Sequence, residues 1–135
     1  MLTRMSQSGI NWRPLESRKG ISLERGQSMA SYLLQVAYTA EALTAMIKKP
    51  HNRGEAVRKP IEKLGGSIHG FWLSFGDYDV VAIIEMPDNV SAAAFALAAA
   101  GGGACKSVKT TPLLSAEDGV AAMKLAATSG YKPAK

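Results

Sequence analysis

The stretch FWLSFGDYDVVAIIEMPD, residues 71–88, decides the fold that this sequence predicts. It is typical of two strands, over about 67–75 and 78–86, that are joined by a tight turn at Gly76-Asp77. Both strands carry apolar residues on both of their faces, whereas a sheet with one face in water alternates apolar and polar residues. We therefore expect both faces to be covered. In so short a chain, the expected cover for the second face is another copy of the chain.

The rest of the sequence supplies the other elements of a small α+β domain. A strand is expected over 32–38, and Thr39 caps a helix that Pro50 interrupts and that resumes over 52–64, with Pro60 kinking or restarting it. A helix over 90–100, a strand over 104–111 and a last helix over 116–128 follow. This order predicts a ferredoxin-like, four-stranded antiparallel sheet with helices on one face. Two such sheets packed face to face would form a dimeric α+β barrel.

Composition narrows the class of protein. Of 135 residues, 47% are hydrophobic and 20% are charged, which is ordinary for one globular domain with one core. No apolar run reaches the roughly 20 residues of a membrane span. One cysteine forms no internal disulfide, so we expect a cytoplasmic protein. We expect no metal, no cofactor and no membrane partner, and nucleic acid is disfavoured because most of the net charge of +5 lies in residues 1–28.

Residues 1–28 show no sustained period and are rich in serine, glycine and arginine. We interpret them as disordered or as a misplaced start, with the domain itself covering 29–135. Glu24-Arg25-Gly26 can be encoded by a purine run, and that run would resemble a bacterial ribosome-binding site ahead of Met29. We hypothesise that the biological chain begins at Met29.

Several motifs resemble the GYD-domain family. Gly76-Asp77-Tyr78-Asp79-Val80-Val81 is similar to the family's signature, and further matching motifs occur in the right order. These are Tyr38-Thr39, Arg53, Leu64-Gly65-Gly66, Glu85 before Pro87-Asp88, and the glycine-rich break before the fourth strand. The resemblance covers about 32–111, with the last helix as an addition. It implies the fold of the dimeric α+β barrels and leaves the activity open.

His69 and Glu85 are the candidate catalytic residues. In a hairpin that turns at Gly76-Asp77, His69 lies almost opposite Glu85, on the strand face that also holds Phe71. A carboxylate beside an imidazole orients its tautomer and supports acid–base chemistry. A plain cross-strand ion pair is the simpler interpretation. Trp72 is expected on the opposite face, as a core or interface anchor.

The candidate ligand-binding residues are Tyr38, Trp72, Tyr78, Asp79 and Arg53. We expect Tyr38, Trp72 and Tyr78, together with His69 and Glu85, to line a pocket between sheet and helices. Gly76 is expected to supply a backbone conformation that other residues resist. The basic residues between Lys48 and Lys63 are interpreted as a solvated helix face, with an anion-binding patch as the alternative. Cys105 is interpreted as a small hydrophobic residue rather than a nucleophile.

Three functions remain open from the sequence. The first is a homodimeric barrel that binds or senses a small molecule. The second is a cofactor-independent enzyme, monooxygenase-like or isomerase-like, which rests on fold analogy alone and requires His69 and Glu85 to face a cavity. The third is a structural oligomerisation module, which a filled interior would favour.

Overall fold

The computed structural model describes residues 29–134, so the interpretation of residues 1–28 lies outside it. Four strands and four helices follow one another in the order expected from the sequence. They are β1 (Ala30–Tyr38), α2 (Ala40–Lys48), α3 (Arg53–Lys63), β2 (Ser67–Leu73), β3 (Val80–Met86), α4 (Asn89–Gly101), β4 (Cys105–Leu113) and α5 (Ala116–Ala126).

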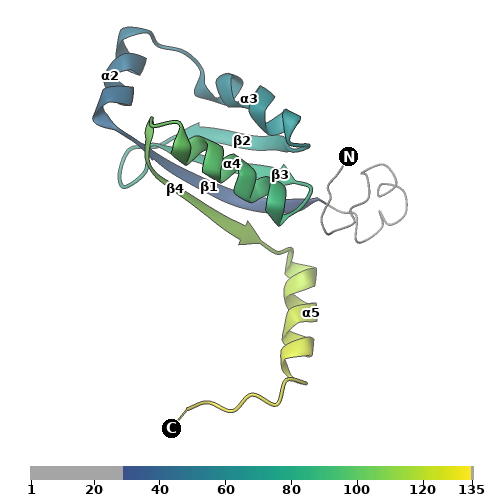
Figure 1. Ribbon diagram of the computed structural model, residues 1–135. Helices are drawn as coiled ribbons and strands as arrows, with labels where there is room; N and C mark the ends of the chain where they lie inside the picture. The colour runs from purple at the N-terminus through teal and green to yellow at the C-terminus, as the bar shows by residue number, and fades with distance from the viewer. Residues whose placement is uncertain (1–28, 135) are drawn as a thin grey trace.

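The four strands form one antiparallel sheet in the order β2-β3-β1-β4. α3 packs over β2, and α4 packs over β3 and β4, so both helices lie on the same face of the sheet (Figure 1). This arrangement confirms the predicted α+β, ferredoxin-like fold. We call the face beneath α3 and α4 the helix face and the opposite one the open face.

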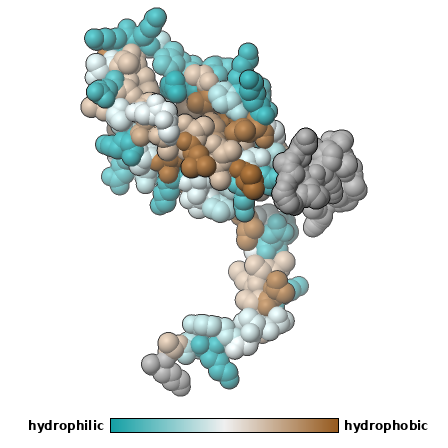
Figure 2. Space-filling model, viewed as in Figure 1, coloured by the Kyte–Doolittle hydropathy of each residue, from teal (hydrophilic) through white to brown (hydrophobic). Residues whose placement is uncertain are grey.

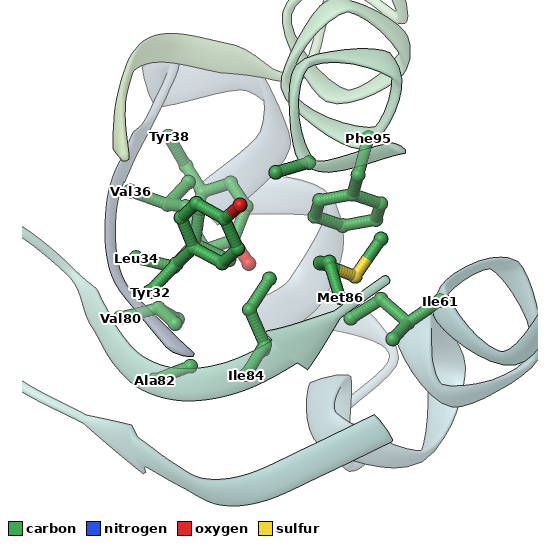
Figure 3. Packing of buried hydrophobic residues seen from close by; sticks show 11 residues of the cluster. Tyr32, Leu34, Val36, Tyr38, Ile61, Val80, Ala82, Ile84, Met86 and Phe95 are labelled. Carbon is green, nitrogen blue, oxygen red and sulfur yellow. The ribbon is translucent and has the colours of Figure 1, made fainter. Parts of the chain in front are cut away.

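The core lies between the sheet and these two helices (Figure 3). Alternate residues of the two central strands point into it, and Ile61 of α3 and Phe95 of α4 close it from above. Burying one such side chain stabilises the fold by about 1.5–3 kcal/mol. The strand residues are Tyr32, Leu34, Val36 and Tyr38 of β1, and Val80, Ala82, Ile84 and Met86 of β3.

Capping residues fix where the helices begin. The Thr39 hydroxyl accepts a hydrogen bond from the backbone N–H of Ala42 at the start of α2, and the Asn52 side chain accepts one from Glu55 N–H at the start of α3. The break at Pro50 is confirmed, because α2 ends before it and α3 begins after it. Pro60, by contrast, lies within α3 and does not restart the helix.

A β-bulge in β2 corrects the expected assignment of side chains to faces. Ile68 pairs with Ile84, but Gly70 pairs with Ile83, so His69 is one extra residue in β2. Strict alternation therefore fails beyond this point. Phe71 pairs with Ala82 of the helix face, and Trp72 pairs with Val81 of the open face, which is the reverse of the prediction.

The open face has an apolar centre with polar ends. Its central row contains Leu33 of β1 and Ile83 of β3, and Val81 and Trp72 lie in the adjoining row. The polar residues lie toward the two ends of the strands, with Glu85, Ser31 and Ser67 at one end and Gln35 and Lys109 at the other. The Trp72 side chain is 56% exposed. No described helix covers this face.

α5 extends away from the body of the protein (Figure 1), and none of its residues is buried. Its apolar side chains are in contact with solvent, as Figure 2 shows along this helix and over α4. They include Val120 and Met123, and α4 exposes Val90 and Leu97. No helix in residues 29–134 has the length and apolar character needed to cross a membrane.

Gly76 does not supply the backbone conformation expected of it. Among the described residues, the glycines with positive φ are Gly65, Gly103 and Gly130. A Cβ atom added at Gly76 would meet nothing within 4 Å. Packing against backbone requires a glycine at position 66, because a Cβ atom there would collide with the backbone oxygen of Glu85 and with Met86.

We predict that Gly66→Ala destabilises the protein by about 1–3 kcal/mol, because β2 must move away from β3 to admit the methyl group. Urea unfolding monitored by circular dichroism measures this loss. Gly76→Ala is the matched control and should leave the free energy of unfolding within about 0.5 kcal/mol of the wild type. Equal midpoints for the two variants would contradict this account of Gly66.

Candidate functional site

A cavity of about 290 Å³ lies between the helix face of the sheet and helices α3 and α4. Its floor comes from β1, β3 and the edge strands, and its walls come from the two helices. The lining is mostly apolar and includes Leu34, Val36, Val57, Phe71 and Phe95. Apolar cavities with few polar groups are typical sites for small organic ligands.

The sequence of α4 explains the space. Its first half packs on the core through Ala92 and Phe95, whereas its second half contributes only small residues to the cavity, namely Ala98, Ala99 and Gly102. Small side chains leave volume that longer ones would fill. Ala98 and Gly102 are exposed, as are Ala56 and Pro60 on α3, so these residues mark the opening between the two helices.

Arg53, Tyr38 and Cys105 bring polar groups to the cavity. The Arg53 guanidinium carbon lies 6.0 Å from the centre of the Tyr38 ring, within the range of a cation–π contact. Arg53 Nη1 lies 3.2 Å from His51 Nε2. Burial raises the pKa of the Cys105 thiol, and the positive charge of Arg53 acts on that pKa in the opposite direction.

The hydrogen bonds of His51 specify how it meets Arg53. His51 Nδ1 lies 3.1 Å from the carbonyl oxygen of Lys49, which can only accept, so Nδ1 carries the proton. In the neutral ring Nε2 is then an acceptor, and Arg53 Nη1 donates to it. The loop between α2 and α3 therefore orients the guanidinium from outside the cavity.

The structure brings two of the predicted ligand-binding residues, Tyr38 and Arg53, together in this cavity. The predicted membership of the pocket is otherwise corrected, because His69, Trp72, Tyr78 and Glu85 lie outside its lining. For Trp72 the physical reason is the bulge in β2, which moves its side chain to the open face, whereas His69 reaches Glu85 on that face. Glu85 shares the open face with them. Their functional roles stay predictions.

His69 and Glu85 do meet, as the hairpin geometry predicts. His69 Nε2 lies 3.2 Å from Glu85 Oε1, and their side chains are 54% and 31% exposed. The Trp72 ring lies over Gly70 beside this pair, where a Cβ atom would collide with it. His69 also borders a polar depression of about 270 Å³ with Glu55 and Arg58 of α3.

Asp79 holds the end of β1 in place. Its Oδ2 atom accepts a hydrogen bond from Tyr38 N–H (2.8 Å), and its own N–H donates to the carbonyl oxygen of Val36 (2.8 Å). Its carbonyl oxygen accepts from Ser74 N–H (2.8 Å), which closes the loop between β2 and β3. Asp79 therefore acts on the cavity indirectly, by positioning the Tyr38 backbone.

Tyr78, half-buried in the same loop, accepts a hydrogen bond from the Ser74 hydroxyl through its carbonyl oxygen.

The basic residues of α3 separate into two groups. Arg58 forms an exposed ion pair with Glu55 (2.9 Å), and its hydrogen bond and charge lower the pKa of that carboxyl. This is the solvated face that the sequence indicates. Arg53 instead shares a helical stripe with Val57 and Ile61, at intervals of four residues. An arginine within an otherwise apolar helical stripe is the sequence pattern that indicates the Arg53 end of the cavity. The apolar residues that line the rest of the cavity show no pattern that distinguishes them from core residues.

We predict that Asp79→Ala destabilises the protein by about 1–3 kcal/mol, because the Tyr38 N–H then loses its acceptor. Asp79→Asn keeps an acceptor oxygen and should lose less. Thermal and urea unfolding measure both losses. Asp77→Ala removes the neighbouring exposed carboxylate and serves as the control. If Asp77→Ala lowers the free energy of unfolding as much as Asp79→Ala does, the hydrogen bonds of Asp79 are not the reason why this position stabilises the fold.

Comparison with known proteins supports the resemblance to the GYD-domain family. The profile of the GYD domain matches residues 32–123, which include most of β1 and α5 and all of β2, β3 and β4. The match extends beyond the expected end at 111 and reaches into α5. Searches of curated proteins and of solved structures found no match. The match covers more than half of the sequence, and the chain therefore belongs to the GYD-domain family.

Proposed function

We propose that this protein binds and senses a small molecule, which occupies the cavity between the sheet and helices α3 and α4. The observation that carries the proposal is the cavity itself. Its volume of about 290 Å³ equals that of roughly ten water molecules in the liquid, enough for one ring with a short chain. An apolar space that opens to solvent between two helices is typical of a ligand-binding groove.

The proposal predicts that neutral apolar molecules such as toluene and octanol bind in the cavity. Titration followed in amide NMR spectra should shift the signals of Val57, Phe71 and Cys105, which line it. Ala99→Leu adds three carbon atoms to the cavity wall and should weaken binding at least tenfold.

Ala93→Leu makes the same change on the exposed side of α4 and serves as the control. It should bind both probes as the wild type does. If neither probe shifts the lining signals of the wild-type protein, or if both alanine variants bind equally, the cavity is not the binding site.

The second part of the proposal is a homodimer in which the open faces of the two copies pack against each other. We place this dimer in the cytoplasm, because a single cysteine is typical of proteins from a reducing compartment. A two-fold axis across the strands, near Leu33 and Ile83, places the two apolar centres against each other. It also places the end that holds Glu85 and Ser31 against the end that holds Gln35 and Lys109 of the other copy. α5 supports the same partner, because an 11-residue helix without packing is marginal in water.

Ile83→Glu tests the dimer. It places a charge at the centre of the proposed interface and should convert a dimer to a monomer in native mass spectrometry and sedimentation. The fold should persist, because Ile83 lies outside the core of a single chain. Val90→Glu changes an exposed apolar residue of α4 and should leave the dimer intact. A monomeric wild type, or a dimeric Ile83→Glu variant, would rule out this interface.

An enzyme is the second candidate, and the contact between His69 and Glu85 is the observation that favours it. The pair has the geometry in which a carboxylate orients an imidazole for proton transfer. In the proposed dimer, it would lie beside Trp72 at the edge of the interface, and a substrate would have to enter there. We place binding first, because the apolar cavity lies on the other side of the sheet.

A further inference from the structure

The Arg53 guanidinium carries hydrogen-bonding capacity that no residue within 29–134 uses. Its Nε atom is buried and has no hydrogen-bond partner among the described residues. Nη1 is taken by His51. Nε–H and the adjacent Nη2–H lie on one side of the guanidinium, and such a fork matches the two oxygens of a carboxylate.

The charge of Arg53 is also uncompensated. The residues that line the cavity include no aspartate or glutamate. Within residues 29–134, no carboxylate lies within ion-pair distance of Arg53, whereas Arg58 has Glu55. Arg53 is the first residue of α3, where the helix dipole opposes a positive charge. Stability alone therefore does not explain a cation at this position.

We propose that the ligand of this cavity is an apolar monoanion, whose carboxylate binds the Nε–H and Nη2–H fork of Arg53 and whose hydrocarbon part fills the apolar space. This inference rests on the proposed function and names its ligand class. The Tyr38 ring borders the carboxylate end, and Leu34, Val57 and Phe71 surround the hydrocarbon part.

The charge balance selects a monoanion. One guanidinium neutralises one carboxylate, and the Cys105 thiol, with its raised pKa, adds no charge near neutral pH. A phosphate dianion would leave a second charge unpaired against apolar walls, which is costly. A neutral amide of the same shape would leave the Nε–H fork with one acceptor instead of two.

Matched pairs of probes test the proposal. Hydrocinnamate and octanoate carry a carboxylate, and hydrocinnamide and octanamide are their neutral counterparts of equal size. Dissociation constants from NMR titration at constant ionic strength should show the carboxylates binding roughly 10- to 100-fold more tightly than the amides.

Arg53→Gln should remove this preference, so that the acid and amide of each pair bind alike. Arg53→Lys keeps the charge without the fork and should retain part of the preference. Arg58→Gln removes the same charge from the exposed side of α3 and serves as the control, with the wild-type preference expected. Circular dichroism and thermal unfolding verify that each variant is folded.

The outcomes separate this inference from the proposed function. If acids and amides bind equally to the wild type, or if Arg53→Gln keeps the preference, the anionic ligand class is wrong and the cavity proposal stands. The same holds if toluene and octanol bind but the carboxylates do not. If none of the probes binds, the proposed function fails and the inference fails with it.

Discussion

The hydrogen bonds of Asp79 are the constraint on which both faces of the protein depend. They join the loop between β2 and β3 to the end of β1, at the point where the register with β4 shifts between Ala37 and Tyr38. Because the Tyr38 backbone is fixed there, its ring lies on the helix face against Arg53. Asp79 of the GYD signature therefore has a structural role, and it affects the cavity by fixing the position of β1.

The fold was predictable because its signals are local and agree with one another. Thr39 caps a helix where the sequence indicates, and apolar runs give four strands in the order of a ferredoxin-like sheet. The bulge at His69 was not predictable in this way. One extra residue leaves the composition of β2 unchanged, yet it exchanges the faces of Phe71 and Trp72. The contact between His69 and Glu85 persists because the exchange of faces begins only after His69.

The cavity was only half predictable for a different reason. Tyr38 and Arg53 were recognisable as chemistry-bearing residues, but the space between them depends on the distance between α3 and α4. That distance follows from packing at Ile61 and Phe95, whereas the volume follows from the absence of large side chains at Ala98, Ala99 and Gly102. An alanine-rich helix indicates close approach equally well, so the pattern alone does not distinguish a tight contact from a cavity.

A sensing role requires that the cavity and the proposed dimer interface be linked, and β1 is the element that they share. Leu34 and Val36 line the cavity. Their neighbours along β1, Leu33 and Gln35, face the open side of the sheet. A ligand that changes the position of β1 therefore changes the surface offered to a second copy. By reciprocity, dimerisation would change ligand affinity by the same factor. Because Asp79 holds the end of β1 by hydrogen bonds, it would limit how far this strand moves when a ligand binds.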